Sequence, residues 1–280
     1  MRPSISRRAF LASLGLGSVA WTGYAGCVEP TWLDIGRHDV KTNVPGGAPV
    51  KLLHLSDFHA SWCVSLEYIE QAVACGLRLK PDLICVTGDF ITGTYDDFEG
   101  YRRVLQRLAA AAPAFACLGN HDGGLWSRYH HGYHDTHRVR HLLEQSGLEL
   151  LHNRSRTISV RGRAIYLAGV GDCYAEEAEP ERAFAAPAPP GAARVVLSHN
   201  PDTKVMLRPY PWDLMLSGHT HGGQFWLPLI GAPFAPVEDK RFIAGLYRWD
   251  NRWLHVTKGV GNVHGLRFNC RPEISLLTVI

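Results

Sequence analysis

The 280-residue sequence has almost no net charge once its first residues are set aside. It contains 29 Lys and Arg against 26 Asp and Glu, and three of the basic residues, Arg2, Arg7 and Arg8, precede Cys27. The 26 basic residues that remain balance the 26 acidic ones, so we expect no basic nucleic-acid-binding face. A charged fraction of 20% beside 46% hydrophobic residues also excludes an intrinsically disordered chain.

Other familiar signatures are missing as well. There is no internal repeat, and the 28 glycines and 17 prolines are scattered, which excludes collagen and coiled-coil architectures. The absence of a Gly-x-Ser-x-Gly elbow and of a phosphate-binding P-loop disfavours acyl hydrolysis by a serine and P-loop nucleotide hydrolysis. What the sequence does have is an apolar fraction sufficient for a core and a surplus of 15 histidines.

Residues 1–27 resemble an export signal. The string SRRAFL at residues 6–11 is similar to a twin-arginine signal, and a mildly apolar run follows it from residue 9 to residue 24. This run contains several glycines and falls short of the ~20 strongly apolar residues that a membrane span needs, so we expect a signal rather than an anchor. Residues 24–27 also resemble a lipoprotein cleavage box, which leaves a lipid anchor at Cys27 open. The expected location is the periplasm or the outer face of the cytoplasmic membrane.

From residue 50 onward, apolar runs of strand and helix character alternate along the chain. The expected order is strand 50–56, helix 66–79, strand 83–87, helix 101–111, strand 114–118, helix 139–145, strands 164–170, 194–198 and 213–217, a hairpin of 246–249 with 253–257, and strand 274–280. This alternation predicts an α/β sheet with helices on its faces. Residues 28–49 are a polar lead-in without periodicity, and the folded domain is expected at residues 50–280.

Polar clusters follow five of the predicted strands. They are Asp57-Phe58-His59, Gly88-Asp89-Phe90, Gly119-Asn120-His121-Asp122, Ser198-His199-Asn200 and Gly218-His219-Thr220-His221. The carboxyl ends of strands in an open α/β sheet converge on the crevice that holds the site. Carboxylates, imidazoles and an amide oxygen suit divalent first-row metal ions. A single histidine after a strand is more often only hydrogen-bonded, but five such clusters in one chain favour a shared metal site.

The order of these clusters resembles that of the calcineurin-like metallophosphoesterases, from about residue 51 to the C-terminus. The strings LSD at 55–57, SHNPD at 198–202, GHTHGGQ at 218–224 and RPEI at 271–274 are similar to a branch with bacterial exported phosphodiesterases and UDP-2,3-diacylglucosamine pyrophosphohydrolases. Residues 259–269 depart in part from that branch, although Arg267 matches its usual arginine. The resemblance implies an α/β fold of the four-layer, α+β-like kind, in which helices flank two packed mixed β-sheets.

The resemblance also implies a role for each residue of the site. Two divalent ions, of Mn, Fe, Zn, Co or Ni, would hold a bridging hydroxide that attacks a phosphodiester or pyrophosphate, as expected of a metal-dependent phosphoric ester hydrolase. Their seven ligands would be Asp57, His59 and His221 at the first ion, Asn120, His199 and His219 at the second, and Asp89 between the two. His121 would act as the general acid, and Asp122 would orient it.

The substrate is expected to be a lipid or cell-envelope phosphoester, such as UDP-2,3-diacylglucosamine. A nucleotidase or phosphomonoesterase on the same fold, and a non-catalytic metal-binding envelope protein, stay open as alternatives. Residues 225–237 lack charge, and they form either core or an apolar lip that contacts a membrane surface. The contacting residues would be Phe225, Trp226, Leu229 and Ile230.

The histidines that remain fall into two sets. His130, His131, His134, His137 and His141 crowd one stretch, which is either a solvated loop with a helix start or a rim that binds a phosphate or headgroup. No role is assigned to the other five, His38, His54, His152, His255 and His264. The cysteines show no diagnostic spacing, and a disulfide among three of them in predicted loops stays open. These three are Cys63, Cys173 and Cys270.

Overall fold

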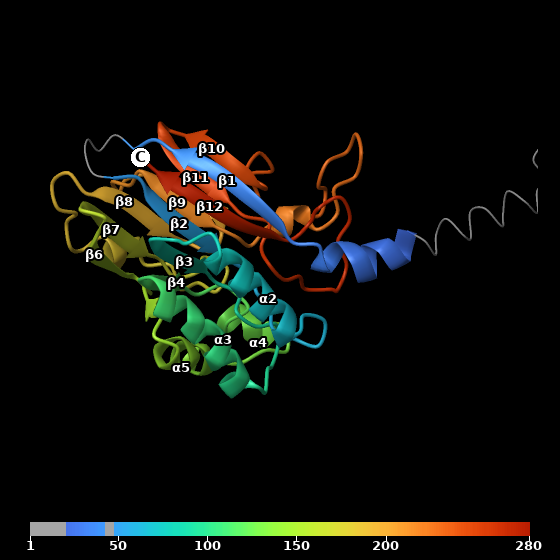
Figure 1. Ribbon diagram of the computed structural model, residues 1–280. Helices are drawn as coiled ribbons and strands as arrows, with labels where there is room; N and C mark the ends of the chain where they lie inside the picture. Colours follow the sequence, from blue (N-terminus) through green and yellow to red (C-terminus); the bar gives the residue numbers. More distant parts are fainter. Residues whose placement is uncertain (1–20, 43–47) are drawn as a thin grey trace, which may run out of the picture.

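Two six-stranded mixed sheets pack face to face in the computed structural model, which describes residues 21–42 and 48–280 (Figure 1). The first sheet has the order β1 (Asp34–Val40), β12 (Glu273–Val279), β2 (Val50–Leu55), β3 (Leu83–Thr87), β4 (Ala114–Cys117) and β5 (Glu149–Leu150). The second has the order β10 (Gly245–Trp249), β11 (Arg252–Val256), β9 (Leu214–Ser217), β8 (Ala193–Leu197), β7 (Arg163–Gly169) and β6 (Arg154–Val160). The predicted fold class is confirmed.

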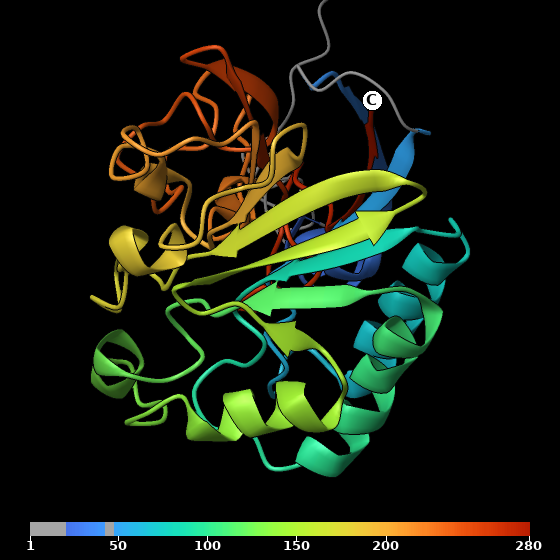
Figure 2. The same ribbon diagram turned by 90° about the vertical axis from the view of Figure 1, so that its left-hand side faces the viewer.

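Helices cover the outer face of the first sheet, as Figure 2 shows. They are α2 (Leu66–Leu77), α3 (Phe98–Ala111) and α5 (His137–Gln145). The first two begin at side-chain caps, because Ser65 accepts a hydrogen bond from the Tyr68 N–H and Asp97 accepts one from the Gly100 N–H. Their apolar faces pack on the sheet.

Shorter helical segments complete the described chain. They are α4 (Leu125–Tyr129), α6 (Pro180–Ala183), η1 (Tyr24–Val28), η2 (Glu29–Thr31), η3 (Pro201–Lys204) and η4 (His221–Gly223). Among the described residues, no helix combines the length and the apolar character that crossing a membrane requires. The seven cysteines, all of which are described, are free thiols, so the disulfide left open by the sequence is not formed.

The core between the two sheets is apolar at one end and polar at the other. Leu52, Cys85 and Leu277 of the first sheet meet Leu197 and Leu216 of the second, and all five are fully buried. Towards one end of the strands, the buried side chains between the sheets become polar. They are His54, Thr87, His255 and Ser275. This polar rim lies at the end where the predicted site clusters follow their strands.

The structure adds three strands that the sequence analysis does not predict. The shortest, β5, pairs in parallel with β4. β1 lies in the segment treated as a lead-in, and it pairs in parallel with β12, with Asp34 opposite Glu273. β6 pairs with β7 as an antiparallel edge strand. Of the predicted signal, residues 1–20 lie outside the described part of the chain.

Candidate metal centre

The turns after five strands hold the predicted metal-binding side chains in an unusual backbone conformation. Five of these residues have positive φ angles between 50° and 67°, in the left-handed region that side-chain-bearing residues rarely adopt: Asp57, His59, Asp89, His219 and His221. Glycine makes the close packing of these turns feasible, because a Cβ at Gly88 would lie 2.5 Å from the Gly119 nitrogen and 2.8 Å from Nδ1 of His199. Such a cluster of strained residues is typical of functional sites.

The first group of predicted ligands is assembled from two loops that are distant in sequence. Asp57 and His59 follow β2, and His221 follows β9. The Nε2 atoms of His59 and His221 lie 3.0 Å apart, and Oδ1 of Asp57 is 3.4 Å from Nε2 of His221. All three residues are at most 5% exposed. The structure therefore places one carboxylate and two imidazoles where one cation can contact them all.

The second group lies beside the first. Oδ2 of Asp89 is 3.1 Å from Nε2 of His199 and 3.4 Å from Nε2 of His59, so this carboxylate lies between the two groups. Nδ1 of His219 is 3.2 Å from Nε2 of His199. The side-chain oxygen of Asn120 is buried and has no hydrogen-bond partner among the described residues. The seven predicted ligands are thus all brought together, with Asp89 in the middle.

The outer nitrogens of three histidines are engaged with oxygen atoms. Nδ1 of His59 lies 2.6 Å from Thr92 Oγ1, Nδ1 of His199 lies 2.7 Å from the Thr87 carbonyl, and Nε2 of His219 lies 3.0 Å from the Pro236 carbonyl. A carbonyl oxygen can only accept a hydrogen bond, so the outer nitrogens of His199 and His219 carry protons, and in the neutral rings the inner nitrogens hold the lone pairs. The same arrangement follows for His59 when its Nδ1–H donates to Thr92. Metal-binding histidines almost always donate a hydrogen bond in this way from the ring nitrogen that does not bind the metal.

The charges of the site also fit divalent cations. Burial alone would raise the pKa of Asp89, but the neighbouring imidazoles of His199 and His121 hold its pKa well below the usual range. Two buried carboxylates and several inward lone pairs would repel one another without positive charge between them. The buried, unpartnered oxygen of Asn120 adds a further donor that only a ligand would satisfy. The residues present therefore fit a metal centre.

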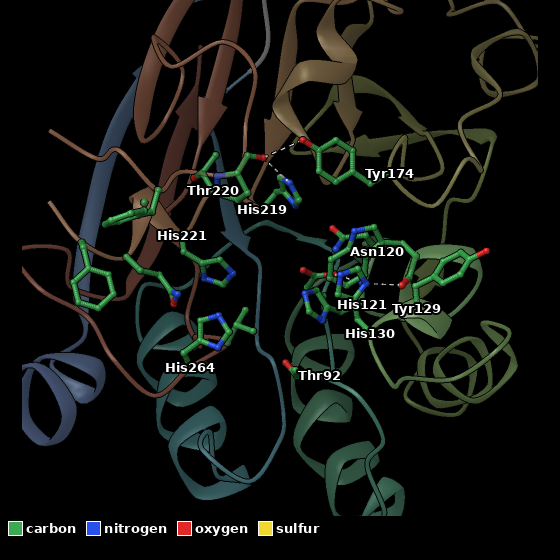
Figure 3. Close-up of a pocket in the computed structure, with 18 of the residues that line it drawn as sticks. Thr92, Asn120, His121, Tyr129, His130, Tyr174, His219, Thr220, His221 and His264 are labelled. Atoms are coloured by element: carbon green, nitrogen blue, oxygen red, sulfur yellow. Dashed lines mark hydrogen bonds between the residues drawn. The ribbon is translucent and has the colours of Figure 1, made fainter.

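His121 lies at the wall of a cavity that opens onto this centre. The cavity has a volume of about 940 Å³ and is lined by Asn120, His121, His219 and His221 at its base (Figure 3). The ring of His121 is 4.8 Å from that of His59 and 4.4 Å from that of Trp126, measured between centroids. The predicted acid is thus beside the proposed ligands and accessible from the cavity.

Asp122 is not where the sequence analysis places it. Its two carboxylate oxygens accept hydrogen bonds from the backbone N–H groups of Asp89, Phe90 and Gly119, at 2.7–2.9 Å. Within the described residues, none of its hydrogen bonds goes to the His121 ring. The prediction that Asp122 orients His121 is wrong, because the tight turn after β4 directs this carboxylate towards the loop after β3. Its role is to join these two loops.

The site also contains groups that the sequence analysis missed. Thr92 and the carbonyls of Thr87 and Pro236 orient the histidines. Every residue has a backbone carbonyl, so no signal in the sequence could have identified the carbonyls of Thr87 and Pro236 as hydrogen-bond partners. Trp126 was equally overlooked, although its place five residues after His121 in a short helix would have put it near the site.

A family model described as calcineurin-like phosphoesterase matches residues 50–223, which is more than half of the chain and includes all five clusters. The chain belongs to this family. The resemblance inferred from the order of the clusters is confirmed, and with it the assignment to metal-dependent hydrolases of phosphoesters. Its helices and two mixed sheets are those the family implied.

Full-length relatives of the chain lie in the same family. It is 42% identical over 279 residues to the phosphodiesterase YaeI of Escherichia coli (strain K12), covering 99% of this chain and 100% of that protein. It is 31% identical over 288 residues to the uncharacterized metallophosphoesterase YkuE of Bacillus subtilis (strain 168), covering 98% of each. It is 29% identical over 329 residues to the UDP-2,3-diacylglucosamine pyrophosphatase LpxG of Chlamydia trachomatis, covering 98% of this chain and 97% of that one.

The upper walls of the family's site are largely apolar in this chain. Trp21, Trp126, Phe225 and Phe234 line the cavity, and Tyr174 closes one side. The uncharged stretch 225–237 is partly buried and partly exposed. Three of its residues are buried against Ile243, and four of its large apolar side chains are exposed. The buried ones are Ala232, Ala235 and Val237, and the exposed ones are Trp226, Leu229, Ile230 and Phe234.

The crowded histidines are divided in a similar way. His130 and His131 line the cavity, and the His130 ring stacks on Trp126 with 3.7 Å between centroids. The other three, His134, His137 and His141, are not among the residues that line it. Of the histidines without an assigned role, His264 lines the opposite wall.

Proposed function

We propose that this protein hydrolyses a phosphodiester or pyrophosphate bond at a two-metal centre. The observation that supports it is the convergence of seven buried donor residues, with Asp89 between two groups of imidazoles, at the base of an accessible cavity. Asp57, His59 and His221 would bind one cation, Asn120, His199 and His219 the other, and Asp89 both. Bound cations would supply a water molecule of lowered pKa and positive charge against the phosphoryl oxygens.

The other residues of the site orient the metal-binding imidazoles and donate a proton. Thr92, and the carbonyls of Thr87 and Pro236, hold three imidazoles in the tautomers that binding requires. His121 donates the proton to the leaving oxygen. Burial lowers the pKa of His121 to about 3, so the imidazole of the resting site is neutral. The negative charge of a phosphoester bound beside it raises that pKa and favours the protonated form.

We further propose that the substrate carries a lipid or another large apolar group. The apolar walls of the cavity, formed by tryptophan and phenylalanine side chains, would bind such a group while the phosphoester reaches the centre. Relatives named as a phosphodiesterase and as a UDP-2,3-diacylglucosamine pyrophosphatase support a diester or pyrophosphate on this fold. A nucleotidase or monoesterase and a non-catalytic metal protein are the alternatives to be separated by experiment.

The mouth of the cavity would face a membrane surface in an exported protein. Leu229, Ile230 and Phe234 stand 69–109% exposed beside it. Trp21 lines the same cavity and packs on Phe268, so the described chain begins at this mouth. Trp21 itself belongs to the apolar run of the twin-arginine-like signal, residues 9–24. An uncleaved leader and the exposed apolar loop would therefore lie on one side of the molecule. Cleavage before Cys27 would remove Trp21 and would leave Cys27, which is exposed, as the site for an acyl chain.

Turnover and metal content, measured together on the full chain, test the proposal. We expect Mn²⁺-loaded protein to hydrolyse bis-p-nitrophenyl phosphate and at least one of a lipid pyrophosphate, a glycerophosphodiester and a cyclic nucleotide. Asp89→Asn should abolish turnover and reduce bound metal to one ion or none, because the carboxylate between the two groups is lost. Asp96→Asn, at an exposed carboxylate, serves as the control.

The results separate the alternatives clearly. Two bound ions with full turnover in Asp89→Asn would overturn the assignment of the centre. Bound metal without turnover of any phosphoester would favour the non-catalytic protein. Turnover of p-nitrophenyl phosphate or nucleoside monophosphates alone would favour the monoesterase or nucleotidase.

A further inference from the structure

A second cluster of metal-ligating side chains lies between the edges of the two sheets, apart from the centre described above. His38 is on β1, Glu273 on β12 and His255 on β11, and one ligand atom from each lies within 4.8 Å of the others. His255 is fully buried, Glu273 is 4% exposed, and His38 is partly exposed. We propose that these three side chains bind a divalent cation of the zinc class.

The strand register brings the three residues to one point. Asp34 lies opposite Glu273 and Gly36 opposite Ser275 in the parallel pair β1–β12, so positions 36 and 38 of β1 share the face that turns towards the second sheet. Gly36 provides the space. A Cβ there would lie 2.6 Å from Oε1 of Glu273 and 3.4 Å from Nε2 of His38. Because glycine has no Cβ, the Glu273 carboxylate and the His38 imidazole can both lie close to the backbone of residue 36.

The hydrogen bonds of His255 leave one nitrogen unpartnered. Nδ1 of His255 lies 2.9 Å from Nδ1 of His54, whose Nε2 lies 2.8 Å from Oγ1 of Thr87. Nε2 of His255 is buried and has no hydrogen-bond partner among the described residues. A proton on that Nε2 would be a buried donor without an acceptor, which is costly. The network is best satisfied when His255 donates from Nδ1 and presents a bare Nε2 to the cluster, as a metal-binding histidine does.

The competing charge at the site is Lys258. Its Nζ lies 3.4 Å from Oε2 of Glu273, but also 4.0 Å from Oδ2 of Asp34, and the side chain is 29% exposed. A divalent cation at Glu273 would leave the ammonium with Asp34 and solvent. The Oε1 atom of Glu273 accepts a hydrogen bond from Ser275, which fixes the carboxylate. Two imidazoles and a carboxylate, with water in the fourth position, are a known ligand set for Zn²⁺.

Occupancy of this site would join the first sheet to the second. Within the described residues, β1 is an edge strand with β12 as its one neighbour in the sheet, whereas β11 belongs to the other sheet. A cation held by residues of all three strands would attach β1 to both. Because the cation binds the folded chain, the melting temperature should rise with free zinc concentration.

Zinc stoichiometry measured on the full chain tests this site. Protein freed of metal with a chelator is dialysed against Zn²⁺, and bound metal is counted by elemental analysis. We expect His38→Ala to bind one Zn²⁺ per chain fewer than the parent protein, and to show a smaller rise of melting temperature with zinc. Reloaded with Mn²⁺, it should hydrolyse bis-p-nitrophenyl phosphate within twofold of the parent rate. His141→Ala, at an exposed helical histidine, is the matched control and should lose no zinc.

Two further variants separate this site from the two-metal centre. In an Asp89→Asn background, where the centre is impaired, His38→Ala should still remove one Zn²⁺. Lys258→Met removes the competing ammonium, so it should tighten the binding of that Zn²⁺ at least tenfold, an effect that a purely structural cluster would not show. Equal zinc counts with and without His38 in both backgrounds, or no change of affinity in Lys258→Met, would overturn the proposal.

Discussion

His121 differs from three of the four predicted metal-binding imidazoles in how it is held. Three of those rings have an outer nitrogen bonded to an oxygen atom, whereas no hydrogen bond of the His121 ring is found within residues 21–42 and 48–280. Its ring is positioned by packing against His59 and Trp126, and its backbone N–H donates to Oδ1 of Asp89. An imidazole that is fixed in place but free at its nitrogens can transfer a proton, which a ligand cannot.

Replacement of His121 should therefore depend on the leaving group. We expect His121→Ala to retain both metal ions and to slow substrates with poor leaving groups by about 100-fold or more, since general-acid catalysis contributes about 10²–10⁴-fold. Aryl phosphodiesters, whose leaving group departs without a proton, should slow by less than about tenfold. Rates along a series of leaving groups, with metal content measured on the same samples, check this. Equal slowing of both classes would argue against the acid role, and His141→Ala is the control.

For single residues, the sequence predicts which side chains lie together in the site but not which partners each of them contacts. Clusters such as His219-Thr220-His221 are visible because residue type and position after a strand coincide. Asp122 belongs to the same kind of cluster, yet it bonds three backbone N–H groups instead of the imidazole beside it. Which way a side chain points from a tight turn is decided by φ and ψ, and these depend on the loops packed around it.

Among the elements, those with strong apolar runs are predictable and those at sheet edges are not. β2, β3, β8 and β9 are almost continuously buried and agree with prediction within one residue at either end. β1 is partly or well exposed at every position except its last residue, Val40, and its partner β12 lies at the other end of the chain. A strand whose only hydrogen-bonding neighbour is more than 200 residues away leaves no local pattern, because its pairing is a tertiary effect.

The loop from residue 258 to residue 270 depends on one buried arginine. The guanidinium of Arg267 is fully buried and donates to the backbone carbonyls of Lys258, Gly259, Gly261, Cys270 and His221. This side chain therefore ties the turn that holds a proposed ligand to the C-terminal loop. Its identity was visible in the sequence, but its partners were not, since all five are backbone groups.

Loss of this arginine should destabilise the loop 258–270. We expect Arg267→Ala to lower the free energy of unfolding by roughly 3 kcal/mol or more, because hydrogen bonds to a charged group contribute about 1.5–3 kcal/mol each and the carbonyls would stay buried. Metal affinity should fall with it through His221. Urea unfolding measures the change, and Arg248→Ala, on the exposed hairpin, should stay within about 0.5 kcal/mol of the parent. A stability loss no larger than the control's would contradict this role.

The exposed part of the loop 225–237 should govern contact with lipid. We expect Leu229→Ser with Ile230→Ser to weaken binding to anionic phospholipid vesicles by about tenfold, since two exposed apolar side chains are lost from the contact. Turnover of soluble bis-p-nitrophenyl phosphate should stay unchanged, because neither residue lines the cavity. Val205→Ser with Met206→Ser, at exposed apolar residues elsewhere, is the control. Vesicle binding equal to that of the parent would contradict the membrane contact.

On the scale of the whole molecule, strands near the two ends of the described chain pair with each other in the first sheet. β1, which follows the predicted signal, pairs along its full length with β12, the last strand. The backbone N–H of Arg267 also donates to the Ala25 carbonyl, 2.9 Å away. The first sheet is therefore complete only after synthesis of the C-terminus. We propose that a route for folded proteins exports the chain with β1 and β12 already paired.

This leads to a prediction for the twin-arginine-like signal, whose arginine pair lies outside the described residues. Replacing both Arg7 and Arg8 with Lys should hold the protein in the cytoplasm of a bacterial host, folded and active on bis-p-nitrophenyl phosphate once supplied with metal. The charge is conserved, so only a route that recognises the arginines themselves would respond. Activity in the fractions of lysed cells measures the outcome, and Arg2→Lys is the control. Undiminished export of the double variant would overturn the assignment of the twin-arginine route.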